Sequence, residues 1–282
     1  MIGFIILHYN VFDETKNCVE SILKNIKNSK KIIIVDNGSS NNSAKELEKY
    51  YKENSEVEII ETNKNLGFAN GNNFGYAYAK KKYDMDFCVV MNNDMEILQE
   101  DFVDKIYNFY NKDKFDILGP DIFSTKLKYH QNPQAQRNYK LNELIRFRNI
   151  LFLRNKFPKL FFGLSNIKQK LIKPKIKNKE LIKQTIFGCP LHGACYIFSR
   201  RFLDNHNKCF FDKTFMYQES YILHYLATQK NEVIVYYPEI QVLHHEDVAT
   251  DSVNRKKYEK YKFINKCLYD STTEFIKLMK GM

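Results

Sequence analysis

Hydrophobic positions along this chain form short continuous runs that alternate with amphipathic stretches. Residues 2–8, 31–36 and 87–91 are almost wholly apolar, which is typical of strands buried on both faces. Residues 13–28, between the first two runs, carry apolar side chains at helical spacing. Strands that alternate with helices in this way predict a mostly parallel sheet covered by helices. The expected fold class is therefore α/β.

The same reading extends to the rest of the chain. Ser43 followed by Glu46 has the pattern of a capping box, which predicts a helix start at Ser43. Further strands are predicted at 57–61, 117–120, 194–199 and 233–237, and further helices at 43–53, 70–82, 102–110, 220–227 and 254–279.

A basic segment interrupts this alternation. Residues 137–183 contain 14 lysines and arginines against two acidic residues, whereas the net charge of the whole chain is +11. Bulky apolar residues lie between the cations, as in segments that bind an anionic membrane interface. A solvated basic face over an ordinary core is the alternative. Nucleic acid is not an expected partner, because no nucleic-acid-binding motif accompanies the aromatic residues. The segment is interpreted as an inserted basic hairpin or helix pair.

Composition limits the class and the location of the protein. With 282 residues and 44% hydrophobic content, the chain is expected to be globular. Its six cysteines contain no C-x-x-C pair, which favours reduced thiols in a cytosolic protein. The chain starts with a core strand and has no run of 18 apolar residues, so neither a signal peptide nor a membrane span is expected.

Two neighbouring features indicate a ligand site. Residues 65–75 contain three glycines and four asparagines, so their backbone can turn tightly and approach a ligand closely. Asp94 follows the apolar run 87–91 and should lie at the carboxyl edge of the sheet, where open α/β folds bind ligands. A glycine-rich turn, a strand and an acid together favour a phosphorylated ligand with a divalent metal.

Seven short motifs in this chain resemble, in the same order, those of family 2 glycosyltransferases with the GT-A fold, in the small bacterial rhamnosyltransferase-like branch. The resemblance is weakest between about 125 and 185. The motifs are residues 5–10, 35–40, 65–75, 92–94, 193–195 with Arg200 and Arg201, 215–219 and 238–244.

This resemblance implies one GT-A domain over residues 1–282, with a basic helical insertion and a C-terminal helix. Its parts would be a nucleotide-sugar-binding half (1–120), the basic and apolar insertion (121–185), an acceptor and catalytic half (186–252) and the C-terminal helix (253–282).

The implied function is an inverting, metal-dependent transfer of a hexosyl or deoxyhexosyl group in bacterial surface polysaccharide synthesis. The donor would be a UDP- or dTDP-linked sugar, and the acceptor a glycan or a polyprenyl-pyrophosphate-linked molecule. The enzyme would lie in the cytoplasm, peripheral on the inner face of the cell membrane. A homo-oligomer is left open.

The resemblance also assigns donor-binding residues. Asp36 would contact the base or ribose, although an Asx turn at the strand end is the alternative. Tyr9 and Asn10 would do the same, or form loop structure. Asn73 would lie early in the following helix, whose free N–H groups attract a diphosphate. The other expected donor contacts are Asn65, Gly67, Asn92 and Asn93.

Asp94 is the expected main ligand of Mn²⁺ or Mg²⁺, which would neutralise the leaving diphosphate. Many GT-A enzymes carry Asp-x-Asp here, whereas this chain has Asn92 and Asn93 before Asp94. The resemblance places a second contact at His244, and the adjacent His245 makes the choice of histidine ambiguous. An imidazole ligand favours Mn²⁺ somewhat.

Glu219 is the expected general base, because an inverting transferase needs a carboxylate to take the acceptor proton. The family usually carries a second acid after it, where this chain has Ser220. Asp212 and Asp247 are reserve candidates. The acceptor and sugar pocket would include His192, Gly193 and Tyr217.

Two other functions remain open from the sequence. Ser220 could mark a catalytically weak or inactive sugar-nucleotide-binding member of the family. A sugar-nucleotide-forming nucleotidyltransferase shares the strand–helix alternation, but the N-terminus offers only Gly3 where that class carries a glycine-rich loop.

Overall fold

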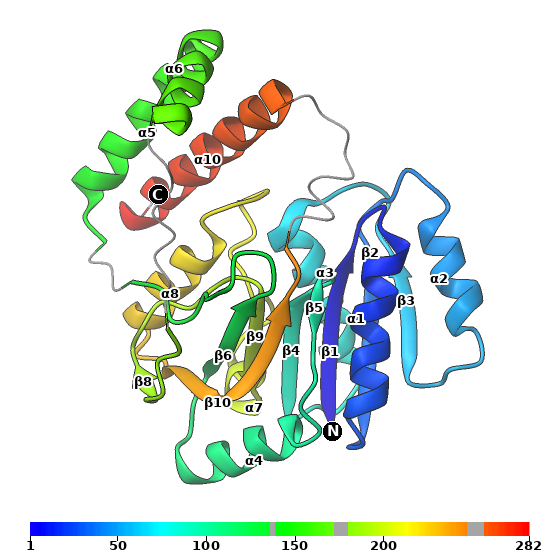
Figure 1. Ribbon diagram of the computed structural model, residues 1–282. Coiled ribbons are helices and arrows are strands. Elements are labelled where there is room, and N and C mark those ends of the chain that lie inside the picture. Colours follow the sequence, from blue (N-terminus) through cyan, green and yellow to red (C-terminus); the bar gives the residue numbers. More distant parts are fainter. Residues whose placement is uncertain (136–138, 172–179, 247–256, 282) are drawn as a thin grey trace.

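The computed structural model describes residues 1–135, 139–171, 180–246 and 257–281. Within these ranges the chain forms one ten-stranded sheet in the order β3-β2-β1-β4-β9-β6-β10-β5, with β7 beside β6 and β8 beside β10 (Figure 1). The strands are β1 (Ile2–His8), β2 (Lys30–Asp36), β3 (Val57–Glu61), β4 (Phe87–Asn92), β5 (Met95–Glu96), β6 (Ile117–Ser124), β7 (Tyr129–His130), β8 (Ile186–Phe187), β9 (Cys195–Ser199) and β10 (Ile234–His244).

Helices cover both faces of this sheet. They are α1 (Phe12–Asn25), α2 (Ser43–Tyr51), α3 (Gly67–Lys82), α4 (Phe102–Lys112), α5 (Leu141–Lys156), α6 (Pro158–Leu171), α7 (Arg200–Asn205), α8 (Glu219–Gln229) and α10 (Lys257–Met279). Phe4 and Ile6 of β1 belong to a core that includes residues of α1, α2 and α4, whereas Ile5 belongs to a second core with α3, α7 and α8. Because both faces of β1 are buried, its sequence is a continuous apolar run.

The sheet is mixed but mostly parallel in its N-terminal half. Strands β3, β2, β1 and β4 are parallel neighbours, and β6 is parallel to β10. Strand β9 runs antiparallel between β4 and β6. The predicted α/β class, with a mostly parallel sheet flanked by helices, is therefore confirmed.

Strand β10 is longer than the predicted 233–237. Its pairing with β6 shifts register between Tyr237 and Gln241. Pro238 lies at this shift and has no N–H to donate, which accounts for the irregularity. The strand then continues to His244, which brings that histidine to the carboxyl edge of the sheet.

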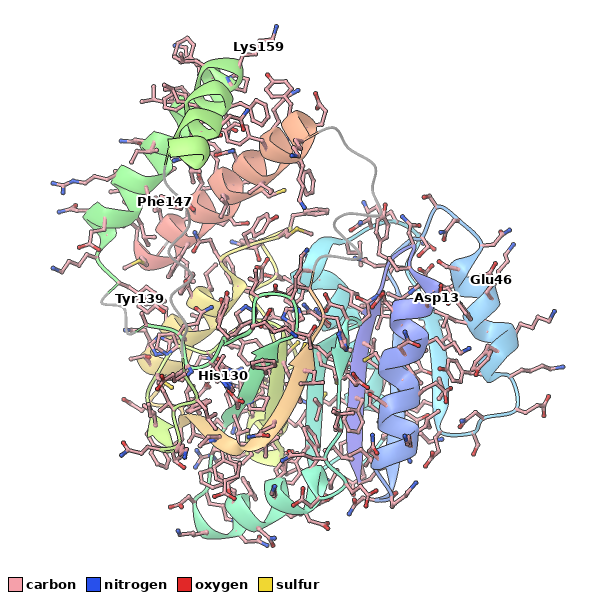
Figure 2. The ribbon with its side chains drawn as sticks, viewed as in Figure 1. Asp13, Glu46, His130, Tyr139, Phe147 and Lys159 are labelled. Carbon is pink, nitrogen blue, oxygen red and sulfur yellow. The ribbon has the colours of Figure 1, made fainter. Side chains whose placement is uncertain are left out.

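Three helices form a layer beyond the sheet. Figure 1 shows α5, α6 and α10 together on the side to which the arrows of β1 and β10 point. Within the predicted basic segment 137–183, the described residues include the helices α5 and α6, which agrees with the helix pair among the two predicted forms. Leu151 of α5 is fully buried, whereas side chains such as that of Lys159 project outward in Figure 2.

Some local predictions were wrong. Helix α3 begins at Gly67, three residues before the predicted start. The capping box at Ser43 does not form, because Asn42 is the N-cap and the Ser43 hydroxyl donates to Asn41 Oδ1 at 2.6 Å. The short elements α7, β5, β7 and β8 carry too few residues for a periodic signal.

All six cysteines are free and buried. None of the helices in the described ranges combines the length and apolar character needed to cross a membrane.

Candidate active site

A cavity of about 470 Å³ opens at the carboxyl edge of the sheet, and we call it the donor cavity. It lies where β1 and β4 end and α3 begins, and residues Phe215, Met216, Lys260 and Phe263 complete its wall. Six of the residues expected to contact donor or metal line it, namely Tyr9, Asn65, Gly67, Asn92, Asn93 and Asp94.

An asparagine network shapes the turn that leads into α3. Asn65 Oδ1 accepts the N–H of Gly67 at 2.8 Å. Asn37 Oδ1 accepts the N–H of Leu66 at 2.9 Å, and its Nδ2 donates to the carbonyl oxygen of Gly67 at 3.1 Å. Asn37 itself lines the donor cavity. Side-chain amides thus replace regular backbone pairing here, as expected for a turn rich in asparagine.

Gly67 is required by its own conformation and by a neighbour. Its φ is +80°, a backbone conformation that residues with a side chain rarely adopt. A Cβ at this position would lie 2.1 Å from the carbonyl oxygen of Phe215. That same oxygen accepts the N–H of Phe68 at 2.7 Å. The glycine-rich turn therefore holds the start of α3 directly against the segment 215–219.

The segment 215–219 is held in a strained conformation. Tyr217 and Gln218 have φ of +71° and +69°, which cost a non-glycine residue about 1–3 kcal/mol each. Helix α10 holds them from the other side, since the Ser271 hydroxyl donates to the carbonyl oxygen of Met216 at 2.8 Å. Gln218 Nε2 donates to Thr272 Oγ1 at 3.2 Å. Such strain persists where the surrounding structure fixes a functional segment.

Glu219 is the first residue of α8 and is 7% exposed. Burial raises its pKa from 4.5 to about 7, and hydrogen bonds from its own N–H and from Thr214 offset this only in part. Its Oε1 has no hydrogen-bond partner among the described residues. A carboxylate with a pKa near neutrality is suited to accept a proton. Glu219 is not itself among the residues that line the donor cavity.

Neighbouring groups leave Glu219 as the main acid of this region. Ser220, at the position of the usual second acid, carries no carboxylate and lies beside the phenol of buried Tyr196. Asp212 pairs with Lys208, which lowers the pKa of that carboxyl group. Asp247 lies outside the described residues.

Asp94 and His244 face each other. Asp94 is 8% exposed, and its Oδ1 lies 3.3 Å from His244 Nε2. His244 Nδ1 donates to Gln131 Oε1 at 2.7 Å, because an amide oxygen can only accept, and this contact orients Nε2 towards Asp94. The ring of His245 instead bonds Glu96 Oε2 at 2.9 Å and Thr125 Oγ1 at 3.1 Å. Of the two histidines, His244 is therefore the one whose ring pairs with the Asp94 carboxylate.

This pair fits one divalent ion. Asp94 Oδ1 is buried and has no hydrogen-bond partner among the described residues, so it is a free hard-oxygen donor beside an imidazole nitrogen. The described residues contain no cluster of three or more His, Cys, Asp or Glu side chains that could hold a metal. An ion here would therefore take its other ligands from phosphate oxygens and water.

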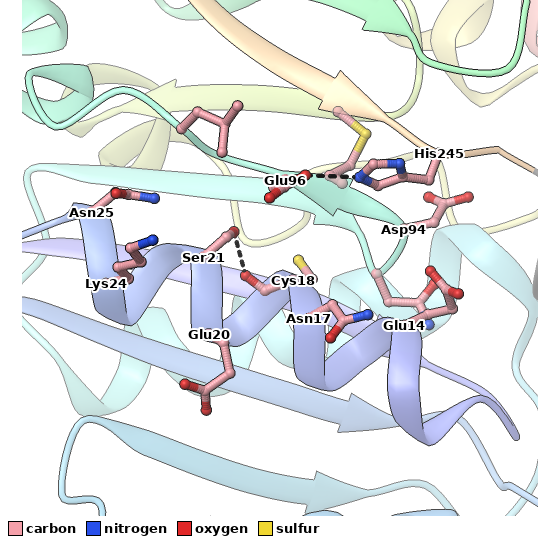
Figure 3. Close-up of a pocket in the computed structure, with 13 residues that line it drawn as sticks. Glu14, Asn17, Cys18, Glu20, Ser21, Lys24, Asn25, Asp94, Glu96 and His245 are labelled. Carbon is pink, nitrogen blue, oxygen red and sulfur yellow. Dashed lines mark hydrogen bonds and ion pairs between the residues drawn. The ribbon is translucent and has the colours of Figure 1, made fainter.

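A second cavity, of about 730 Å³, lies on the α1 side of Asp94 (Figure 3). Asn93 and Asp94 line both cavities. Three further carboxylates, those of Glu14, Glu20 and Glu96, line the second one. Burial and the charge of Asp94 raise the pKa of Glu14. Asp94 thus lies where the two cavities meet.

Comparison with known proteins places the chain in a family. The model of "Glycosyl transferase family 2" matches residues 4–174. The chain belongs to glycosyl transferase family 2.

Two curated relatives are glycosyltransferases. The chain is 26% identical over 123 residues to the low-salt glycan biosynthesis hexosyltransferase Agl10 of Haloferax volcanii, across 44% of this chain and 37% of that protein. It is 30% identical over 125 residues to glycosyltransferase GlyG of Streptococcus pneumoniae serotype 4, across 41% of each. The chain thus spans about two fifths of the length of these relatives.

Solved structures of S. aureus TarS share the fold. TarS 1-349 in complex with UDP aligns with a TM-score of 0.56 at 11% identity, covering 94% of this chain and 64% of that one. TarS 1-349 aligns at 0.51 and 12% identity, covering 86% and 60%. At these identities the likeness concerns the GT-A fold alone.

Three residues expected to bind the donor in this family 2 member use their polar groups elsewhere. Asp36 accepts the N–H of Ser39, three residues on, at 3.2 Å, so a local turn uses this carboxylate. Asn10 has a φ of +64°, and its Oδ1 accepts the N–H of Ser40 at 2.8 Å, so it forms loop structure. Neither residue lines the donor cavity.

Asn73 is the third, and it lies further into the helix than predicted. Because α3 begins at Gly67, Asn73 lies in the second turn of the helix and is buried. Its Oδ1 accepts the N–H groups of Cys209 and Phe210 at 3.0 and 2.9 Å, and its Nδ2 donates to the Phe210 carbonyl oxygen at 2.9 Å. Asn73 therefore anchors the chain that leads to the 215–219 segment.

Of the expected acceptor-side residues, His192 lies beside the Asp94–His244 pair. The ring centroids of His192 and His244 are 5.8 Å apart. The N–H of His192 donates to Asn132 Oδ1 at 2.6 Å, which fixes the loop. An added Cβ at Gly193 would meet nothing within 4 Å, so space is open in front of it.

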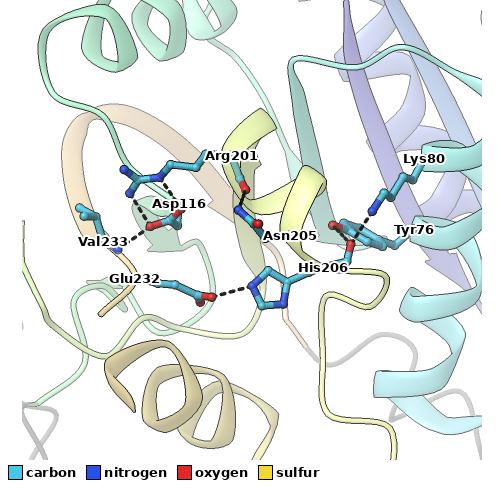
Figure 4. Close-up of polar contacts among 8 residues, drawn as sticks. All are labelled: Tyr76, Lys80, Asp116, Arg201, Asn205, His206, Glu232 and Val233. Atoms are coloured by element: carbon cyan, nitrogen blue, oxygen red, sulfur yellow. Dashed lines mark hydrogen bonds and ion pairs between the residues drawn. The ribbon is translucent and has the colours of Figure 1, made fainter. Parts of the chain in front are cut away.

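The motif residue Arg201 is structural. Figure 4 shows it paired with Asp116, whose Oδ1 accepts from Arg201 Nε at 2.6 Å. Asp116 Oδ2 also accepts the N–H of Val233 at 2.7 Å. This contact joins α7 to the starts of β6 and β10 and does not involve the donor cavity.

Asn37, Lys260 and Phe263 are among the residues of the donor cavity that sequence reasoning did not assign to the site. Asn37 had a signal, since it directly follows Asp36 at a strand end within a recognised motif. Lys260 and Phe263 had none, because only the tertiary fold brings α10 over the sheet edge.

Proposed function

We propose that this chain is an inverting, metal-dependent glycosyltransferase that uses a nucleoside diphosphate sugar. The observation that carries the proposal is the convergence on one cavity of the Gly67 turn, Asp94 and the strained segment that ends at Glu219. The complex of the fold relative TarS with UDP supports a nucleotide as the ligand of this cavity.

The donor would occupy the cavity between β1, α3 and α10. Tyr9 offers a ring to the base, and Asn65 and Gly67 offer the turn that the nucleotide would approach. Lys260 places a cation in the same cavity, where a diphosphate would be attracted. Mn²⁺ or Mg²⁺ held by Asp94 and His244 would neutralise charge on the leaving diphosphate.

Glu219 would act as the general base. The acceptor hydroxyl oxygen attacks the anomeric carbon while the bond from that carbon to the diphosphate oxygen breaks. The hydroxyl proton passes to the Glu219 carboxylate, whose pKa of about 7 allows it to be ionised and still basic near neutral pH. Attack opposite to the leaving group inverts the anomeric configuration.

We further propose a glycan or a polyprenyl-pyrophosphate-linked molecule as acceptor, in bacterial surface polysaccharide synthesis. Residues 1–282 would act as one catalytic domain, peripheral on the inner face of the membrane. The helical layer supports the membrane association. In it, cations such as Arg154 and Lys159 lie among exposed apolar side chains such as Leu160.

Donor turnover by the purified protein tests the proposal. Nucleotide sugars are first screened with Mn²⁺ for thermal stabilisation, because a ligand of the native state raises the melting temperature. The stabilising donor should then be cleaved slowly to its nucleoside diphosphate. Binding without cleavage, with or without acceptors, would indicate an inactive member. Pyrophosphate release from a nucleoside triphosphate and a sugar phosphate would identify a nucleotidyltransferase instead.

A further inference from the structure

A third cavity lies within the helical layer, and we call it the helical cavity. It has a volume of about 540 Å³. Asn155 and Pro158 line it from α5 and α6, and α10 contributes Glu259, Lys262, Phe263, Lys266 and Tyr269. These α10 positions recur at helical spacing, so they form one face of the helix. Asn155 Nδ2 donates to the carbonyl oxygen of Asn265 at 3.3 Å and so links α5 to α10.

The helical cavity is adjacent to the donor cavity. Phe263 lines both of them, and Lys260, less than one turn earlier, lines the donor cavity. The rings of Phe263 and Phe215 have centroids 6.4 Å apart. A molecule in the helical cavity would therefore have one end next to the segment that carries Glu219.

The charges of this cavity favour an anion. Lys262 and Lys266 are four residues apart on α10 and both are exposed, and like charges at this spacing destabilise a helix. Glu259 lies 3.3 Å from Lys262 and compensates that charge. Lys266 forms no ion pair with a carboxylate of the described residues. A phosphate or pyrophosphate group would relieve the repulsion between the two lysines.

The surroundings of the cavity favour an apolar tail. Phe263 and Tyr269 give the cavity itself two aromatic walls. On α5, α6 and the residue between them, six large apolar side chains are at least 44% exposed, in a stretch of 15 residues. They are Ile150, Phe152, Leu153, Phe157, Leu160 and Leu164. So dense an exposed apolar stretch marks a binding surface, and Figure 2 shows the outward side chains of this layer.

We propose that the helical cavity binds the pyrophosphate group of a lipid-linked acceptor. Lys262 and Lys266 contact the pyrophosphate, and the hydrocarbon chain lies along the exposed apolar side chains of α5 and α6. The sugar attached to the pyrophosphate then extends past Phe263 towards the donor cavity. This inference rests on the proposed function and assigns a binding site to the lipid-linked form of its acceptor.

Binding of farnesyl pyrophosphate to the full chain tests the proposal. The titration is done with a chelator, so that no metal holds a pyrophosphate at Asp94. The variant Lys262→Gln/Lys266→Gln should bind the probe about 30-fold more weakly. Each of the two exposed cations is expected to raise the affinity for the anion about fivefold. The matched control is Lys277→Gln, which breaks an equivalent i,i+3 pair with Glu274 on the same helix, away from the cavity. Equal affinity of the double variant and the control would overturn the proposal.

Two further arms assign the ligand. Inorganic pyrophosphate should bind much more weakly than farnesyl pyrophosphate, and equal binding of the two would overturn the lipid assignment. Wild type and the control variant could self-associate as concentration rises while the double variant does not. That result would assign the surface to a second copy of the chain. UDP with Mn²⁺ should bind the double variant as it binds wild type. If wild type itself does not bind UDP, that result would count against the proposed function. It would leave the separate test of the helical cavity unchanged.

Discussion

Replacing Glu219 with glutamine removes the one acid of the 215–219 segment while keeping its shape. This carboxylate would accept the acceptor proton, and its burial makes its charged form costly. Loss of a positioned general base lowers turnover by about 10²–10⁴-fold. Affinity for the donor should change little, because Glu219 does not line the donor cavity.

The pKa of about 7 fixes the pH dependence of the wild-type rate. With that value, about one tenth of the carboxylate is ionised at pH 6 and about nine tenths at pH 8. The rate with acceptor should therefore rise about tenfold between these two pH values. Glu219→Gln should lose this rise together with most of its activity.

The same pKa predicts an effect on stability. Because folding raises the pKa of Glu219 from 4.5 to about 7, the native state binds this proton more tightly than the unfolded state does. Its contribution to stability is full below pH 4.5 and is lost as pH rises through 7, by up to about 3 kcal/mol at 1.36 kcal/mol per pKa unit. Glu219→Gln should thus be more stable than wild type at pH 8, with the difference vanishing near pH 4.5.

Urea unfolding at pH 5 and pH 8, together with acceptor turnover from pH 6 to 8, measures both effects. Glu46→Gln is the matched control, because Glu46 lies in the first turn of α2 but is exposed. The control should show neither effect. An active Glu219→Gln variant, or a wild-type rate that is flat between pH 6 and 8, would refute the reasoning and require another base.

Three other predictions follow from the contacts around the donor cavity. Gly67→Ala should lower stability and activity because its Cβ meets the Phe215 carbonyl oxygen, whereas Gly163→Ala in α6 meets nothing within 4 Å and should be neutral or stabilising in the same melts. Asn73→Ala should lower the free energy of unfolding by about 2–3 kcal/mol, since two buried N–H groups lose their acceptor; a stable variant with only weaker donor binding would restore the original assignment. The full chain should bind anionic vesicles in flotation assays and release them at high salt, and equal binding to neutral vesicles would remove the electrostatic argument.

The strands could be predicted because strands buried on both faces have continuous apolar sequences. Residues 2–8 and 31–36 are apolar on both faces, and the sheet covers both faces with helices. The start of α3 could not be predicted in the same way. Gly67 at φ +80° looks like a turn residue, and the helix begins there because the carbonyl oxygen of Phe215, distant in sequence, accepts the N–H of Phe68.

The candidate site shows the same division. Asp94 and His244 follow apolar strands whose carboxyl ends meet at one edge, so their proximity could be expected. Asp36 and Asn73 carry suitable groups, but a local turn and a distant backbone segment already use them. Lys260 and Phe263 reach the donor cavity only through the packing of α10, which no local pattern describes.

The central claim is that the donor cavity binds a nucleoside diphosphate with a metal held at Asp94. Isothermal titration of UDP and dTDP with Mn²⁺ or a chelator, on wild type and Asp94→Ala, tests it most directly. Wild type should bind at least one of the two nucleotides with Mn²⁺ and lose most of that affinity with the chelator. Asp94→Ala, with an unchanged circular-dichroism spectrum, should show only the weak binding. Metal-dependent binding that survives in Asp94→Ala, or the failure of wild type to bind either nucleotide, would contradict the account.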